Sequence, residues 1–188
     1  MARTLAEVLA AYAPGSDEEA RDLATLRALA VGGARAWARD EPVHATATAV
    51  VVHPPTGRVL LRWHERMRGW LTVGGHGDPG EDAPLAVALR EAEEETGLTD
   101  LVAWPPGAGD DPVHLAVVGV PAGKGEPAHE HADVRFVVAT GRPDDAVPER
   151  PEAPLRWLPV DEAAVAVGED NLRVTLGRVA RLLGATTG

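Results

Sequence analysis

The sequence predicts an α/β protein: an α/β/α sandwich with a mixed sheet, preceded by an N-terminal helical extension. Segments rich in Val and Thr that alternate with a period of two predict strands. Segments with apolar residues three and four positions apart predict helices. The order along the chain is helices, strands, helix, strands, helix, which is typical of layered α/β domains.

Two predicted helices make up residues 1–40. The first covers residues 4–12, and the second covers residues 16–37 with two consecutive glycines in its middle. Both helices are too short to bury a core alone, so we expect an extension to a main domain of residues 41–188. These helices either pack on that domain or mediate a homodimer.

The remaining chain contains the strands of the predicted sheet. We expect strands at residues 43–53, 59–63, 71–73, 112–120, 129–140 and 155–158. The first two are separated by a Pro-Pro-Thr-Gly turn and therefore form a hairpin. A helix begins at Pro84, and a final helix covers residues 170–183.

The strand at residues 129–140 has two different faces. Its polar face carries His129, His131, Asp133 and Arg135. Three of these, His129, His131 and Asp133, can line a substrate pocket, contribute to a metal site or form the solvent face of an edge strand. Because the sequence reveals no third zinc-type ligand nearby, we do not predict zinc.

The composition limits the function classes. A net charge of −11 argues against a nucleic-acid polymer as partner, but a metal ion can bridge the protein to a small phosphorylated substrate. The absence of cysteine removes disulfides and thiolate sites. Glu7 interrupts the first apolar run, so we expect no signal peptide, and no apolar stretch reaches about 18 residues, so we expect no membrane span. We therefore expect a cytoplasmic protein.

The helix that begins at Pro84 ends in an unusual run of carboxylates. Glu91, Glu94 and Glu95 lie three and four positions apart on one stripe, where like charges repel. They also lie near the helix C-terminus, where the helix dipole disfavours anions. A divalent cation would turn this repulsion into binding energy, because hard cations such as Mg²⁺ take oxygen ligands.

A glycine-rich segment precedes this helix. It begins at Gly74-Gly75, which we expect in a loop, and Gly97 closes the carboxylate run. The segment ends in Glu81 and Asp82, of which Asp82 is placed to cap the helix.

Arg90 stands immediately before the carboxylate run. It is placed to pair with a carboxylate of the glycine-rich segment, or with Glu93 or Glu94, and so to steady the site.

Together these residues resemble the Nudix box, G-x5-E-x7-R-E-U-x-E-E-x-G-U, where U is a bulky aliphatic residue. The second half is matched by Arg90, Glu91, Glu94, Glu95, Gly97 and Leu98, with Ala92 in place of the first aliphatic residue. The first half contains one extra residue. Counting from Gly75, Glu81 takes the position of the family glutamate; counting back from Arg90, Asp82 takes it.

The resemblance to Nudix (MutT-like) hydrolases implies a fold and an activity. It implies that Mg²⁺ or Mn²⁺ is held by Glu91, Glu94 and Glu95, with Glu81 or Asp82 as a further ligand. It also implies hydrolysis of a nucleoside diphosphate linked to another group, by attack of water on phosphorus. The catalytic residues would then be Arg90 and the three glutamates.

Outside the box, the sequence offers further candidates. Arg62, Arg66 and Arg68 can meet substrate phosphates or be ordinary surface residues. A later catalytic carboxylate, common in this family, can come from Asp144, Asp145, Glu149 or Glu152.

Two other functions are considered. A catalytically weak or inactive Nudix-fold module that binds a nucleotide or sugar phosphate is the alternative to an enzyme. An isoprenoid diphosphate isomerase is disfavoured, because the related isomerases resemble a Cys-based design and this chain has no cysteine.

Overall fold

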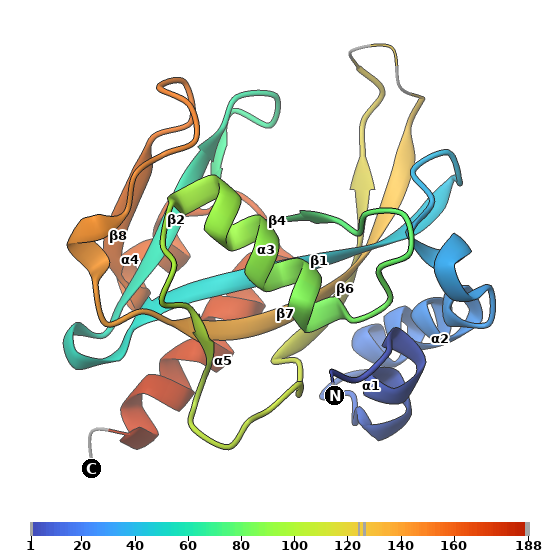
Figure 1. Cartoon of the computed structure of the whole chain (residues 1–188), viewed down its shortest axis with the longest axis horizontal. Helices are drawn as coiled ribbons and strands as arrows, with labels where there is room; N and C mark the ends of the chain where they lie inside the picture. The colour runs from blue at the N-terminus through green and yellow to red at the C-terminus, as the bar shows by residue number, and fades with distance from the viewer. Residues whose placement is uncertain (1, 124, 126, 187–188) are drawn as a thin grey trace.

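The computed structural model describes residues 2–123, 125 and 127–186 (Figure 1). The strands are β1 Val43–His53, β2 Arg58–His64, β3 Gly69–Leu71, β4 Val73–His76, β5 Val102–Ala103, β6 His114–Val120, β7 His129–Ala139 and β8 Leu155–Pro159. The helices are α1 Leu5–Ala11, α2 Asp17–Ala30, α3 Pro84–Thr96, α4 Val160–Ala166 and α5 Asp170–Thr186. Within the described chain the strands form one mixed sheet, in the order β3-β2-β1-β7-β5.

The long strand β1 organises this sheet. On one side it pairs in parallel with β7, from Val43 opposite Glu130 to Val52 opposite Ala139. On the other side it pairs with two antiparallel strands, β4 along its first half and β2 at its end. The sheet is completed by β6 beside β7 and β8 beside β2. Because of this pairing, the segment that precedes α3 lies two strands away from the polar residues of β7.

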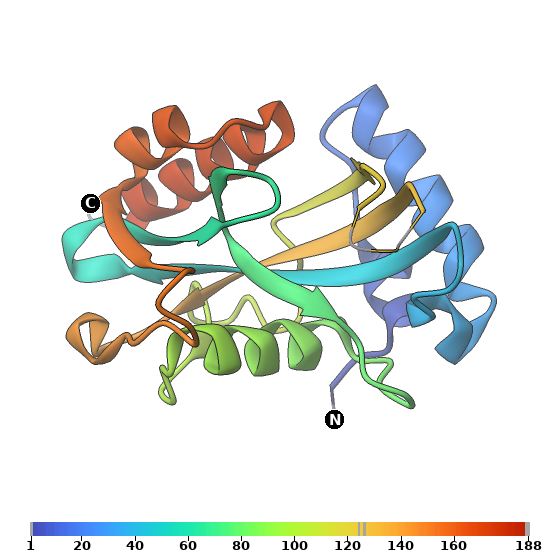
Figure 2. The same cartoon turned by 90° about the horizontal axis from the view of Figure 1, so that it is seen from above.

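The two faces of the sheet pack against different helices. In Figure 2, α3 covers one face, and α4 and α5 cover the other. The face towards α3 is apolar along β1 as far as Val51, with Ala45, Ala47, Ala49 and Val51 all buried. The opposite face of β1 is polar in its first half and becomes apolar at Val50 and Val52, which pack with residues of α5. A hollow can therefore form over the polar half without exposing the core.

The N-terminal helices join the core on the α3 side. Leu5, Leu9 and Leu26 are fully buried in the same cluster as the apolar face of β1. The buried carboxylate of Glu19 accepts hydrogen bonds from Arg178 of α5 at 2.7 and 2.8 Å, which ties α2 to the last helix. No helix in the described part of the chain combines the length and the apolarity needed to cross a membrane.

The fold class predicted from the sequence is confirmed, and β1 has the predicted bounds. The second helix is shorter than predicted: it ends at Ala30, and a 3-10 helix, η1 Gly33–Trp37, begins at the second of the paired glycines. The prediction missed α4 and β5, and the strand expected at residues 71–73 is divided between the ends of β3 and β4.

Two local predictions near α3 are wrong. Gly74 and Gly75 lie in β4 and not in a loop. The residue that caps α3 is Ala83 and not Asp82, and no side chain caps this helix end. Pro84 explains the second difference, because it occupies the first helical position and keeps the residue before it in an extended conformation.

Candidate active site

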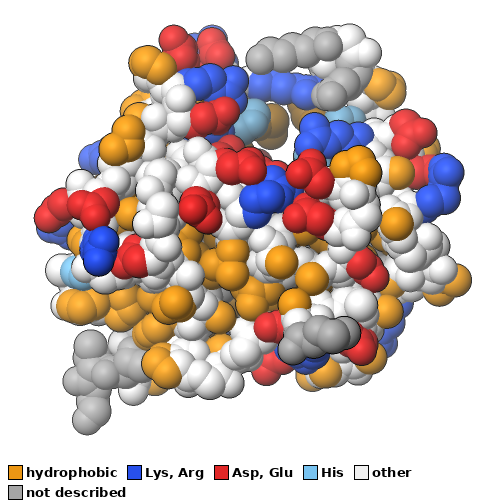
Figure 3. Space-filling view, in the orientation of Figure 1, with side chains coloured by type: hydrophobic (Ala, Val, Ile, Leu, Met, Phe, Trp, Pro, Cys, Tyr) orange, Lys and Arg blue, Asp and Glu red, His pale blue; other side chains and the backbone are white. Residues whose placement is uncertain are grey.

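A cleft of about 1220 Å³ lies on the polar face of β1 and β7, next to β4. Its lining comes from β1, β2, β4, β7 and α3, together with the loops that follow β2 and β6. Figure 3 shows the hollow with histidine side chains inside it, basic side chains at its rim and a row of acidic side chains below its mouth. The cleft therefore offers both cationic and anionic groups to a ligand.

Two carboxylates of α3 reach the cleft beneath β4. Glu91 and Glu95 are one helical turn apart and both line the cleft. The Gly74 N–H donates a hydrogen bond of 3.2 Å to Glu95 Oε2. A Cβ atom on Gly75 would lie 2.4 Å from Glu91 Oε2. Gly75 is thus required because the Glu91 carboxylate approaches the backbone of β4 so closely, whereas a Cβ atom on Gly74 would lie 2.5 Å from the carbonyl oxygen of Ala47 in β1.

Burial governs the electrostatics of these two carboxylates. It raises the pKa of Glu91, although Arg90 donates a hydrogen bond to this carboxylate. Burial also raises the pKa of Glu95 to about 7, against the opposing charge of Arg62 and the hydrogen bond from Gly74. The neighbouring cationic and hydrogen-bonding groups therefore do not fully offset the cost of burying the negative charges of Glu91 and Glu95. A hard divalent cation would supply the missing charge, so this all-oxygen pair fits Mg²⁺ or Mn²⁺.

Arg90 connects the carboxylates to the segment before α3. Its guanidinium donates hydrogen bonds to Glu91 Oε1 at 2.9 Å, to Glu81 Oε2 at 3.0 Å and to the carbonyl of His76 at 2.9 Å. The hydrogen bond from Arg90 lowers the pKa of Glu81. Asp82 instead contributes its backbone carbonyl, which accepts from the Leu5 N–H at 2.7 Å. Of the two candidates before α3, Glu81 is thus the one that pairs with Arg90, and neither Glu81 nor Asp82 lines the cleft.

The third predicted metal ligand is placed differently. Glu94 is more than half exposed, turns towards Arg90 at 3.3 Å and is not part of the cleft wall. Gly97 ends α3 with a φ of 69°, a left-handed conformation that favours glycine. The helix therefore brings Glu91 and Glu95 into the cleft and leaves Glu94 at its edge.

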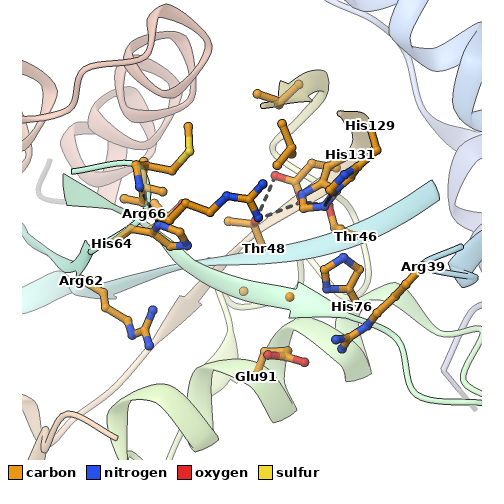
Figure 4. A pocket seen from close by; sticks show the side chains of 18 of the residues that line it. Arg39, Thr46, Thr48, Arg62, His64, Arg66, His76, Glu91, His129 and His131 are labelled. Carbon is orange, nitrogen blue, oxygen red and sulfur yellow. Dashed lines mark hydrogen bonds between the residues drawn. The ribbon is translucent and has the colours of Figure 1, made fainter. Parts of the chain in front are cut away.

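Arginines from three parts of the chain surround the cleft. Arg62 is buried on β2 and lies between Glu95, at 3.1 Å, and Glu149, at 3.4 Å. Arg66 follows β2 and donates to the carbonyl of Pro121, so it reaches across to the loop after β6. Arg39 lines the cleft from the segment before β1 and lies near His76 in Figure 4.

Arg68 does not line the cleft. It is exposed and occupies the turn between β2 and β3 with a φ of 50°.

The four carboxylates predicted as candidates for a later catalytic residue lie in different places relative to the cleft. Glu152 lines the cleft, and Glu149 reaches the site through Arg62. Asp144 and Asp145 lie in a short 3-10 helix, η3 Pro143–Asp145, away from the cleft wall.

The polar face predicted for β7 forms one wall of the cleft. His129, His131, Asp133 and Arg135 all line it. Asp133 is already bound within the protein, because it accepts hydrogen bonds from Thr46 at 3.0 Å, Thr48 at 2.9 Å and Arg135 at 2.8 Å. This aspartate therefore fixes the floor of the cleft, and its contact with substrate stays a prediction.

Sequence reasoning missed two histidines of the cleft. His44 on β1 lies opposite His131 on β7, and His76 on β4 joins them. Burial, together with the charge of Arg39 and the neighbouring histidines, lowers the pKa of His76 to about 3, so this imidazole is neutral near pH 7. The alternating pattern of β1 contained a signal for His44, but only the register of β1 and β7 shows that it meets His131.

The mixed sheet with helices on both faces is the fold of the Nudix hydrolases, a class of enzymes that hydrolyse acid anhydrides. The family model of the NUDIX domain matches residues 43–178. The chain therefore belongs to the Nudix hydrolase family. No curated protein matches it.

Several solved structures share the fold. An Ap4A hydrolase from C. elegans, in a binary complex, is 20% identical with a TM-score of 0.59, over 75% of this chain and 98% of that one. A NUDIX-family hydrolase from Clostridium perfringens is 24% identical with a TM-score of 0.55, over 74% and 97%. The E. coli dihydroneopterin triphosphate pyrophosphohydrolase is 18% identical with a TM-score of 0.54, over 77% and 97%.

Proposed function

We propose that this protein is a metal-dependent pyrophosphohydrolase that cleaves a small nucleoside-diphosphate-X substrate by attack of water on phosphorus. The observation that carries the proposal is the position of Glu91 and Glu95, which enter a large polar cleft against the two glycines of β4. The solved relatives with similar folds include enzymes named for Ap4A and for dihydroneopterin triphosphate, both of which contain phosphoanhydride bonds.

Each charged group has a separate role in this proposal. Arg39 and Arg66 line the cleft and would bind phosphate oxygens of the substrate. Arg62 holds Glu95 in place through an ion pair of 3.1 Å. Mg²⁺ or Mn²⁺ bound by Glu91 and Glu95, with Glu94 at the edge, would polarise phosphoryl oxygens and lower the pKa of water.

A carboxylate is also needed to take the proton of the attacking water. We propose Glu152 for this role, because it is the one of the four later carboxylates, all within the described chain, that lines the cleft. We expect Glu152→Gln to lower kcat by about 10²-fold with KM little changed. An unchanged kcat would assign the role to a box glutamate instead.

The metal-binding roles are tested by measuring phosphate or nucleotide release from a panel of nucleoside-diphosphate-X compounds with Mg²⁺ or Mn²⁺. Glu91→Gln and Glu95→Gln should each lower kcat by at least about 10²-fold, because each removes an anion from the cleft. The matched control is Glu93→Gln, which changes an exposed carboxylate of the same helix and should leave kcat unchanged. Full activity in both cleft variants, with the fold verified by circular dichroism, would contradict the proposal.

The alternative is a Nudix-fold module that binds a nucleotide or sugar phosphate and does not turn it over. The exposed position of Glu94 favours it, because two carboxylates of the run rather than three line the cleft. Calorimetric binding of a nucleoside diphosphate, without hydrolysis in Mg²⁺ or Mn²⁺, would support this alternative over the enzyme.

A further inference from the structure

The end of the cleft on the far side of β4 from Glu91 contains a cluster of histidines: His44, His76, His129 and His131. They come from β1, β4 and β7, and Figure 4 shows their rings grouped together. Nε2 of His44 lies 3.1 Å from Nε2 of His76, and Nε2 of His129 lies 3.2 Å from Nε2 of His131. One ligand atom from each of His44, His129 and His131 lies within 4.8 Å of the other two.

Two backbone carbonyls set the tautomers of this cluster. Nδ1 of His44 lies 2.9 Å from the carbonyl of Glu41, and Nδ1 of His129 lies 2.9 Å from the carbonyl of Pro127. A carbonyl oxygen only accepts, so each Nδ1 must carry the proton. In the neutral rings, Nε2 then presents a lone pair to the centre of the cluster. Histidines that bind metals are commonly oriented by such a hydrogen bond from the other ring nitrogen.

The distances within the cluster fit a tetrahedral ion. Zn–N bonds of 2.0–2.1 Å at tetrahedral angles separate neighbouring nitrogens by about 3.3–3.4 Å. The Nε2–Nε2 separation of His129 and His131, 3.2 Å, is close to this value. The ligand atom of His44 lies within 4.8 Å of both, so a small movement of one ring would complete the set.

The chemistry of the donors selects the kind of metal. All the candidate ligands are imidazoles, which suit Zn²⁺ and its transition-metal neighbours and do not suit Mg²⁺. Asp133, the nearest carboxylate on the same face of β7, is held by Thr46, Thr48 and Arg135. The histidine cluster thus differs in ligand type from the carboxylates of α3.

We propose that His44, His129 and His131 form a second metal site, which binds one Zn²⁺ ion or a similar transition-metal ion independently of the Glu91 and Glu95 carboxylates. Three protein ligands leave one tetrahedral position for water or a ligand oxygen, as in zinc sites that are open to their substrates. His76 lies beside His44 from β4, and the cleft provides access to all of these histidines. The competing arrangement is a histidine cluster held only by N–H···N hydrogen bonds.

A zinc titration of the full-length, metal-stripped protein distinguishes the two arrangements. With saturating Mg²⁺ present to occupy the carboxylates, the protein should bind one Zn²⁺ per chain. The double variant His129→Ala/His131→Ala should bind Zn²⁺ at least about 100-fold more weakly, because it lacks two of the three ligands. The matched control is His53→Ala, which removes the histidine at the opposite end of β1 from His44. It should leave zinc affinity unchanged.

Two further measurements keep the test valid if the double variant does not fold or if the protein does not hydrolyse pyrophosphates. Co²⁺ added to the unmodified protein should give the intense visible absorption of a tetrahedral site, which needs no variant to fold. Glu91→Gln should keep the same zinc affinity, so the result does not depend on whether the protein hydrolyses a pyrophosphate. Zinc affinity equal in the unmodified protein and the double variant, or no tetrahedral Co²⁺ spectrum, would overturn the second site.

Discussion

At one end of the cleft the two carboxylates proposed to bind metal come from a single helix, whereas at the other end the histidines come from three strands. Glu91 and Glu95 are neighbours on α3, and their positions follow from the helical repeat and from the two glycines of β4. His44, His76 and His131 are distant in sequence and meet because β4 and β7 both pair with β1. One cleft thus combines a set of candidate ligands that are close in sequence on one helix with a set that strand register brings together.

The difference between the two ends has a chemical counterpart. The carboxylate end offers oxygen ligands whose burial leaves negative charge incompletely compensated. The histidine end offers nitrogen ligands, two of which are oriented by backbone carbonyls. The two ends should therefore prefer different metals and respond to different mutations.

The change with the largest expected effect is Gly75→Ala, which should damage the carboxylate end alone. The new methyl group would lie 2.4 Å from Glu91 Oε2, and the flexible end of Glu91 must move away. Displacing a catalytic group by about 1 Å can cost about 10²-fold in rate, so we expect kcat to fall by that amount with little change in stability.

Gly119→Ala is the control for this change, because a Cβ atom at that position of β6 has no atom within 4 Å. Zinc affinity should be the same in both variants. If Gly75→Ala lost zinc binding together with hydrolysis, the two ends would not be independent.

The next largest effect is expected at Glu19, which lies outside the cleft. Its substitution should affect the two ends of the cleft only by lowering the stability of the whole protein. Burial alone would raise the pKa of Glu19, but hydrogen bonds from Arg178, Tyr12, Gly15 and Leu115 outweigh it and lower the pKa to about 2. Glu19→Gln should therefore lower the free energy of unfolding at pH 7 by about 3 kcal/mol, as expected when a buried ion pair loses one partner.

The pH dependence of this effect has a defined sign. The pKa of Glu19 in the folded protein lies below the ordinary glutamate value of 4.5, so the unfolded state binds more protons between these two pH values. The contribution of Glu19 is complete above about pH 5 and decreases as the pH falls towards 2. Urea unfolding at several pH values should show the difference between the two proteins shrinking over this range. A constant difference would indicate that the carboxylate charge is not the cause.

The smallest expected effect is at the floor of the histidine end. Thr46 is buried and donates a hydrogen bond of 3.0 Å to Asp133, so Thr46→Val should lower the free energy of unfolding by about 1 kcal/mol. Thr99→Val, at an exposed position, is the control and should change stability little. The rate of hydrolysis in Thr46→Val should stay near normal, because the change leaves the carboxylate end intact. A large loss of rate would show that the two ends of the cleft depend on each other.

Several elements of the fold could be predicted from the sequence because their signals are local. The strand at residues 43–53 is rich in Val and Thr and is followed by a Pro-Pro-Thr-Gly turn, which together give its bounds. The glutamates of α3 share a stripe that helix geometry alone requires. Two predictions are wrong: the residue that caps α3, and the assignment of Gly74-Gly75 to a loop. In the first case proline overrides the capping preference of Asp82, and in the second the pairing of β4 with β1 overrides the low strand propensity of glycine.

By itself, the sequence determined the family, the layered α/β architecture and the helix that carries Glu91 and Glu95, because each of these depends on residues close together in the chain. Only the tertiary structure decided that Glu81 pairs with Arg90, that Glu94 stays outside the cleft and that His44 meets His131. These contacts depend on strand register and side-chain direction, which a residue pattern constrains to a face but does not place against a partner.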